Sequence, residues 1–173
     1  MPTTPITLSA INVLDQDAFV AALGALFEGS PWIAAETWSS RPFASRDALH
    51  QALCTTMYSA LPERKIALIR AHPDLAGKAA IAGELTPESA SEQSSVGLDR
   101  LSPEEFVTFT RLNRTYNDTF GFPFVICVRE NTKDSILASF ATRLQHPREQ
   151  EIETALGEIA KIARLRLLDA VRD

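Results

Sequence analysis

Hydrophobic side chains recur along the chain at the spacing of amphipathic helices. Near the C-terminal end, Leu156, Ile159 and Ala163 fall three and four residues apart, which places them on one face of a helix. N-cap residues, prolines at first helical positions and glycines after last turns divide this pattern into segments. About eight helices are predicted, over residues 15–28, 31–39, 45–60, 63–71, 86–98, 102–120, 132–145 and 148–171.

The segments between these helices are short. Residues 1–14 are predicted to be an extended lead-in, and the β-branched and aromatic run GFPFVICV (121–128) is also expected to be extended. No repeat, linker or pair of strands joined by a hairpin turn interrupts the pattern. The sequence therefore predicts an all-α fold, a single-domain compact helical bundle over residues 1–173.

Composition narrows the possible partners. A net charge of −5 without a dense basic run argues against nucleic acid, and no apolar run approaches the length needed to span a membrane. The first residues do not have the charged and then apolar pattern of a leader, so none is expected, and the final residues VRD do not match a peroxisomal address. Cys54 and Cys127 are not part of a CxxC pair, so two free thiols in a reducing compartment are expected. We expect a soluble cytoplasmic protein.

One of the three histidines has a neighbourhood that suits chemistry. His72 follows an apolar helical stretch and precedes Pro73, whose ring disfavours helical backbone at the residue before it. We expect His72 at the C-terminus of that helix, where the helix dipole favours a protonated imidazole. Acid–base catalysis and capping of the last carbonyl groups both fit this position. His50 and His146 are weaker candidates.

The predicted helix 86–98 carries a polar face where most helices carry an apolar one. Ser89, Glu92 and Gln93 fall at helical spacing on that face. Glu92 is therefore a second acid–base candidate, with Ser89 and Gln93 as hydrogen-bonding neighbours. The alternative is an ordinary solvated helix face.

A third candidate, Arg166, lies seven residues after Ile159 and so within an apolar stripe. An arginine there needs an anionic partner or a route to water. It could bind a carboxylate of a ligand, or it could form a structural ion pair with an acidic residue elsewhere. Arg164 is predicted to project to the far side, together with Lys161.

Signatures of metal and nucleotide sites are absent from the sequence. The histidines stand far apart, with no HExxH and no Cys/His cluster at ligand spacing. The sequence also lacks GxxxxGK[ST], GxGxxG and GxSxG. If the protein is an enzyme, we expect it to use neither a metal nor a nucleotide.

Four segments together resemble the OHCU decarboxylase family, where OHCU is 2-oxo-4-hydroxy-4-carboxy-5-ureidoimidazoline. They are RAHPDLAGK (70–78), LTPESASEQSSVGL (85–98), LNRTYNDTFGFPFVICVRENTKDSIL (112–137) and EIAKIARLRLLD (158–169). The resemblance implies an all-α homodimeric enzyme that needs no cofactor. It also implies decarboxylation of OHCU to (S)-allantoin and carbon dioxide, the last step of urate-to-allantoin conversion in purine catabolism.

The resemblance also implies residue roles. The family's catalytic histidine matches His72, and its catalytic glutamate matches Glu92. The family's substrate-binding positions match Pro73, Ser89, Gln93, Phe124, Ile126 and Arg166. Backbone groups of the GFPFV segment are expected to contact the substrate ring, and Arg164 is the alternative to Arg166. Val96 stands where a smaller alanine is expected, a departure that should not affect chemistry.

Two other functions fit the same residues. One is a related cofactor-free hydrolase or isomerase that acts on another ureido or cyclic-amide compound. The other is a helical interaction module whose polar groove binds a peptide, which predicts an exposed apolar patch in place of a small closed pocket. The resemblance favours the decarboxylase.

Overall fold

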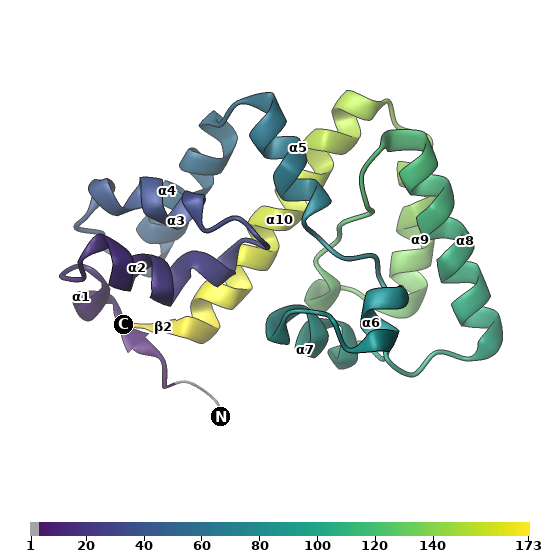
Figure 1. The fold of residues 1–173 in the computed structure, drawn as a ribbon, viewed down its shortest axis with the longest axis horizontal. Helices are drawn as coiled ribbons and strands as arrows, with labels where there is room; N and C mark the ends of the chain where they lie inside the picture. Colours follow the sequence, from purple (N-terminus) through teal and green to yellow (C-terminus); the bar gives the residue numbers. More distant parts are fainter. Residues whose placement is uncertain (1–3) are drawn as a thin grey trace. The chain divides into compact units, whose positions relative to one another are not determined.

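Helices dominate the computed structural model, which describes residues 4–173 and their side chains except those of residues 78 and 79 (Figure 1). The chain packs as two compact units. Unit 1 comprises the chain up to Ala71 together with Ala160–Asp173, and unit 2 is His72–Ile159. The all-α prediction is confirmed, whereas a single domain over residues 1–173 stays a prediction.

Unit 1 contains five helices and the C-terminal part of a sixth. They are α1 (Leu8–Ile11), α2 (Gln16–Leu23), α3 (Trp32–Thr37), α4 (Arg46–Ser59), α5 (Pro62–Arg70) and α10 (Arg148–Ala170). Two 3₁₀ helices, η1 (Gly24–Leu26) and η2 (Trp38–Ser40), follow α2 and α3. Strands β1 (Ile6–Thr7) and β2 (Val171–Arg172) pair in parallel, with Ile6 opposite Val171.

Unit 2 contains four helices and the first part of α10. They are α6 (Lys78–Ala82), α7 (Pro87–Ser95), α8 (Pro103–Phe120) and α9 (Lys133–Arg143). A 3₁₀ helix, η3 (Val128–Glu130), begins at the last residue of the GFPFVICV run. Tyr116, Phe124 and Phe140 form an aromatic core in this unit, with the rings of Phe124 and Phe140 stacked at a centroid separation of 3.7 Å.

Local signals in the sequence explain most helix ends. The Ser102 side chain accepts a hydrogen bond from the Glu105 N–H at 3.1 Å, and the Glu105 carboxylate accepts one from the Ser102 N–H at 3.0 Å. This capping box satisfies two backbone donors that α8 leaves unpaired. Gly121 ends α8 in the left-handed conformation, with φ 79°. Both ends of this helix confirm the prediction.

Three features differ from the prediction. The described part of the chain has ten α-helices, because α1 and α6, of four and five residues, are too short to show a helical period. The lead-in is not wholly extended, since α1 forms within it; residues 1–3 lie outside the described residues. The helix predicted over 15–28 ends as an α-helix at Leu23 and continues as η1.

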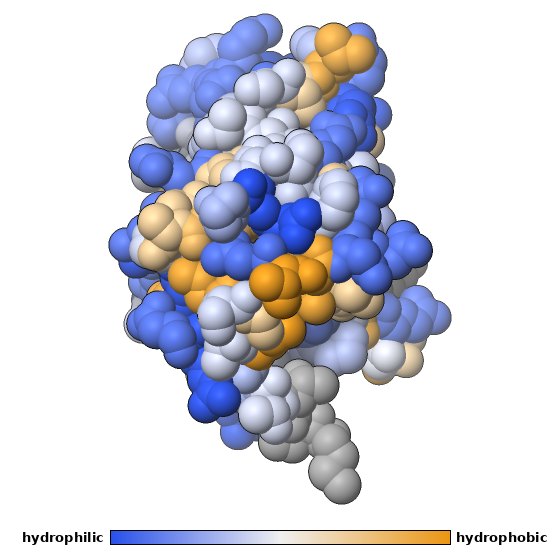
Figure 2. All heavy atoms as spheres, turned by 90° about the vertical axis from the view of Figure 1, so that its left-hand side faces the viewer, coloured by the Kyte–Doolittle hydropathy of each residue, from blue (hydrophilic) through white to orange (hydrophobic). Residues whose placement is uncertain are grey.

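Few large hydrophobic side chains are exposed on unit 1. Figure 2 looks onto the left-hand side of Figure 1 and shows a mostly hydrophilic face with a small hydrophobic patch in its middle. The exposed large hydrophobic residues of this unit are Val13, Tyr58 and Leu61. Among the described residues, no helix combines the length and hydropathy that a transmembrane span requires.

Candidate active site

His72 is the first residue of unit 2 and follows the C-cap of α5. The helix ends at Arg70, with Ala71 as its cap, as expected for a residue pair that precedes proline. The His72 side chain is buried, with a relative exposure of 8%. A histidine that only capped a helix at the surface would remain accessible, so this burial sets His72 apart from an ordinary terminal residue.

The polar face of α7 is turned into the protein. The Thr86 side chain caps this helix and Pro87 occupies its first turn, as predicted. Ser89 and Gln93 are buried, each with a relative exposure of 5%, and Glu92 is half-buried. The alternative of a fully solvated face is therefore wrong, because solvated serine and glutamine would remain exposed.

Residues 122–127 form a buried segment that belongs to no helix and no sheet. Its backbone groups bond to side chains instead. Arg143 Nη1 donates to the Val125 carbonyl at 2.7 Å, and the Cys127 N–H donates to Glu158 Oε2 at 2.9 Å. The ring of Phe124 is fully buried in the aromatic core. Phe124 as a whole is buried in this structure, so a contact between its backbone and a ligand stays a prediction.

Helix α7 contacts both the loop that follows His72 and the 3₁₀ helix that adjoins the segment of Phe124 and Ile126. Gln93 of α7 bonds to the loop that follows His72, and α7 packs against η3. Burial raises the pKa of Cys127 to about 11, with smaller contributions from the carboxylates of Glu130, Glu158 and Glu92. The structure therefore places seven of the eight predicted residues on contacting segments: His72, Pro73, Ser89, Glu92, Gln93, Phe124 and Ile126.

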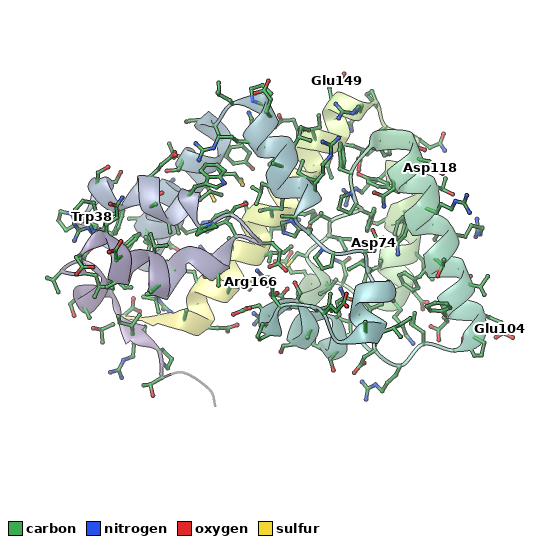
Figure 3. The ribbon with its side chains drawn as sticks, in the orientation of Figure 1. Trp38, Asp74, Glu104, Asp118, Glu149 and Arg166 are labelled. Carbon is green, nitrogen blue, oxygen red and sulfur yellow. The ribbon has the colours of Figure 1, made fainter. Side chains whose placement is uncertain are left out.

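The eighth predicted residue, Arg166, belongs to unit 1 and has a buried setting of its own (Figure 3). Its exposure is 5%, and its Nη1 atom donates to Glu28 Oε2 at 3.1 Å and to the Ala25 carbonyl at 3.2 Å. The structural ion pair considered from the sequence thus exists. Arg164 projects outward, as predicted, and pairs with Asp47 at 2.6 Å. A ligand-binding role for Arg166 stays a prediction.

Sequence reasoning missed a second buried polar cluster in unit 2. The carboxylate of Glu151 is fully buried and accepts hydrogen bonds from Tyr116 Oη at 2.5 Å and Arg143 Nε at 2.7 Å. Its other oxygen lies 2.9 Å from His146 Nδ1. Burial and the adjoining Glu151 carboxylate raise the pKa of Tyr116 far above its ordinary value. Glu151 lies in a charged stretch at the start of α10, so its sequence context gave no sign of burial.

Both cysteines are free thiols in buried or half-buried positions, as predicted. Burial raises the pKa of Cys54 to about 11, the value also reached by Cys127. At pH 8 such a thiol is ionised in about one molecule in a thousand, whereas one with an ordinary pKa is ionised in about one in ten. Because only the thiolate reacts, thiol reagents should label the native protein about 100-fold more slowly than the unfolded protein.

This prediction is checked with dithionitrobenzoate, by following absorbance at pH 8 with and without denaturing urea. The Cys54→Ser variant leaves Cys127 as the sole thiol and so assigns each rate. Labelling of either thiol at the same rate in buffer as in urea would contradict it.

Among residues 4–173, no three His, Cys, Asp or Glu side chains gather closely enough to form a candidate metal site. The groups that the candidate site in unit 2 provides are an imidazole, a carboxylate, buried amides and backbone groups. An imidazole and a carboxylate on contacting segments of a helical protein are typical of an enzyme that uses acid–base catalysis.

Comparison with known families agrees with this class. The family model described as OHCU decarboxylase matches residues 12–168, and the chain belongs to this family. The protein is similar to the 2-oxo-4-hydroxy-4-carboxy-5-ureidoimidazoline decarboxylases of Halalkalicoccus jeotgali and Haloferax volcanii. Each is 44% identical over 164 residues, which cover 95% of this chain and 91% and 95% of the two relatives. The protein of the same name from Amia calva is 40% identical over 162 residues, 94% of this chain and 93% of its own.

Solved structures show the same fold. A crystal structure of (S)-allantoin synthase matches with a TM-score of 0.76 and 29% identity, covering 97% of this chain and 54% of that chain. A crystal structure of an OHCU decarboxylase in the presence of (S)-allantoin matches with a TM-score of 0.65, covering 87% of this chain and 94% of that chain. The second protein is 22% identical, so this likeness concerns the fold alone.

Proposed function

We propose that this protein decarboxylates OHCU to (S)-allantoin and carbon dioxide without a cofactor, as the last step of urate-to-allantoin conversion. Membership of the OHCU decarboxylase family, with the match over residues 12–168, carries the proposal. The contacting segments of unit 2 support it, because they supply an acid–base pair and buried hydrogen-bonding groups in one unit.

The substrate explains why no cofactor is needed. The carbon that loses carbon dioxide bears a hydroxyl and a carboxylate, and its ring neighbour forms a C=N bond. When the carbon–carboxylate bond breaks, its electron pair forms a bond to that neighbour, and the nitrogen accepts the displaced pair together with a proton. The hydroxyl then loses its proton as it becomes a carbonyl, and the neighbouring carbon gains one. The C=N group thus acts as the electron sink that cofactors supply elsewhere.

We assign two of these proton transfers, the removal of the hydroxyl proton and the delivery of a proton to the ring carbon, to His72 and Glu92, one to each group. Delivery of the final proton to one face of the ring would produce a single enantiomer, (S)-allantoin. Ser89 and the backbone beside Phe124 and Ile126 would orient the ring through hydrogen bonds. Arg166 would hold an anionic or carbonyl oxygen of the substrate, with Glu28 orienting its guanidinium group through the 3.1 Å ion pair.

The test generates OHCU in situ from urate with the two preceding enzymes and follows circular dichroism after this protein is added. We expect rapid growth of a single-enantiomer allantoin signal above the slow racemic background. Folded protein that leaves the rate and the optical activity unchanged would contradict the proposal. Parallel assays with hydroxyisourate and allantoin as substrates separate the decarboxylase from a related hydrolase or isomerase.

One observation favours an interaction module as the second candidate. Unit 2 contains a cavity of about 710 Å³ with a mainly apolar lining. Its large apolar residues are Ile81, Leu85, Leu98, Leu101 and Phe106. The lining also includes Gln93, Ser94, Asp99 and Ser102, but its large residues are apolar and would suit an apolar segment of a protein. Absence of turnover with folded protein would move this candidate forward.

We further propose that the enzyme works as a homodimer in the cytoplasm. The two free thiols support a reducing compartment, and the dimer rests on the family resemblance. Light scattering after size-exclusion chromatography measures the mass in solution. A value near the 19.0 kDa of one chain would contradict the dimer.

A further inference from the structure

The loop that follows His72 has no helix or strand of its own and contains one turn, at residues 75 and 76. Residues 72–77 (HPDLAG) lie between α5 and α6 and belong to neither helix. Pro73 has no N–H group to donate, and Ala76 adopts the left-handed conformation, with φ 52°. Alanine rarely adopts this conformation because its Cβ crowds the backbone. Contacts from outside the loop must therefore maintain its path.

Gln93 of α7 supplies two of these contacts. Its Oε1 atom accepts a hydrogen bond from the Ala76 N–H at 2.9 Å, and its Nε2 atom donates to the Asp74 carbonyl at 3.5 Å. The glutamine amide accepts at its oxygen and donates at its nitrogen, whereas a glutamate carboxylate only accepts and would lose the second bond. The side chain is buried, which leaves little access for water to replace it.

Two asparagines of α8 complete the set. Asn113 Nδ2 donates to the Leu75 carbonyl at 2.8 Å, and Asn117 Nδ2 donates to Asp74 Oδ1 at 3.1 Å (Figure 3 labels Asp74). Asn113 is buried and lies in the apolar stripe of its helix. Its Oδ1 atom is also buried and has no hydrogen-bond partner among the described residues. Asn113 therefore contributes to the loop through its N–H donor.

We propose that Gln93, Asn113 and Asn117 form an amide clamp that sets the position of His72, and so act as positioning residues for the reaction. The clamp bonds to residues 74, 75 and 76. Only Pro73 separates these residues from His72, and the ring of Pro73 fixes its own φ angle. The kinetic part of this inference rests on the proposed function; the structural part does not. In this proposal Asn113 and Asn117 hold the loop, and Gln93 also holds the loop without needing to contact the substrate.

The test compares Asn113→Asp with a matched control, Asn12→Asp. Both replace an amide that bonds to loop backbone, since Asn12 bonds to the Phe43 carbonyl at 2.9 Å and to the Phe43 N–H at 2.8 Å. Asn12 lies in unit 1 and outside the clamp. In Asn113→Asp a carboxylate faces the Leu75 carbonyl with no donor, so the loop should shift.

The first readout is the proton NMR spectrum of the histidine rings, assigned with His72→Ala. We expect Asn113→Asp to move the His72 ring resonances and to leave those of His50 in place, whereas Asn12→Asp should leave the His72 ring unchanged. This readout needs no turnover. An unmoved His72 resonance in folded Asn113→Asp protein would overturn the proposal.

The second readout is OHCU turnover. We expect Asn113→Asp to lower kcat by about 10- to 100-fold with KM roughly unchanged, because displacement of an acid–base group weakens the chemical step more than binding. The kcat of Asn12→Asp should match wild type. A loss confined to KM, or a kcat equal to that of the control, would contradict the clamp.

Failure of the wild type to turn over OHCU would reject only the proposed function. If Asn113→Asp does not fold, Asn117→Ala removes the bond to Asp74 and is read in the same two ways.

Discussion

Replacement of His72 by alanine, or of Glu92 by glutamine, should lower kcat for OHCU by about 10²–10⁴-fold in each case. Each variant removes one group that can donate or accept a proton, and water cannot reproduce its position. Glu92→Gln preserves the size and shape of the side chain and removes its ability to transfer a proton, so the loss would report mainly the proton transfer. The two losses should not multiply in the double variant, because one missing partner already disables a pair that works together.

Two controls separate chemistry from folding in this experiment. His50→Ala removes a histidine whose Nε2 atom bonds to the Ala160 carbonyl at 2.8 Å in unit 1. Glu84→Gln neutralises an exposed carboxylate just before α7. Both should retain kcat close to wild type. Circular dichroism in the far ultraviolet and thermal unfolding verify the fold of every variant. A folded His72→Ala protein with wild-type turnover would remove His72 from the mechanism.

Replacement of Glu151 by alanine should lower the free energy of unfolding by about 3–5 kcal/mol. The variant leaves the guanidinium group of Arg143 buried without its carboxylate partner at 2.7 Å, and it leaves Tyr116 Oη without its acceptor. The arginine also donates to the Val125 carbonyl at 2.7 Å, so the extended segment should loosen as well. For a chain of this size, the loss corresponds to a fall in Tm of about 6–20 °C.

Glu149→Ala is the matched control for this prediction. Glu149 lies two residues earlier on α10, and its side chain is exposed (Figure 3). Its removal should change the free energy of unfolding by less than about 0.5 kcal/mol, as for most surface substitutions. Urea titration and differential scanning calorimetry measure both variants. Equal unfolding free energies for the two would show that burial of Glu151 contributes no stability.

Local patterns in the sequence predicted the features whose cause lies within a few residues. The start of α8 at Ser102 and Pro103, the start of α7 at Pro87 and the end of α8 at Gly121 each depend on one helical turn. The period of three to four residues also marked Arg166 as a polar residue in an apolar stripe. Asn113 carried the same signal in α8, and the sequence alone did not connect it to the loop after His72.

The candidate site was predicted in part. Motif resemblance named seven residues that the structure places on three contacting segments of unit 2. The resemblance did not distinguish a residue that contacts the substrate from one that holds the loop. Gln93 was named as a substrate-binding position, and in the structure it bonds to the loop. The resemblance also named Arg166 without its partner Glu28, because the two residues are 138 positions apart in the chain.

The amino-acid sequence by itself determined the helical class, most helix ends and the set of residues able to carry out acid–base chemistry. Each of these follows from backbone preference, side-chain period or residue type within a short window. Only the tertiary structure decided which polar groups are buried and what they bond to. The pairing of Ile6 with Val171, the buried carboxylate of Glu151 and the amide clamp all join distant segments. Such contacts depend on how whole elements pack, since a buried polar group must find its partner wherever the fold brings one near.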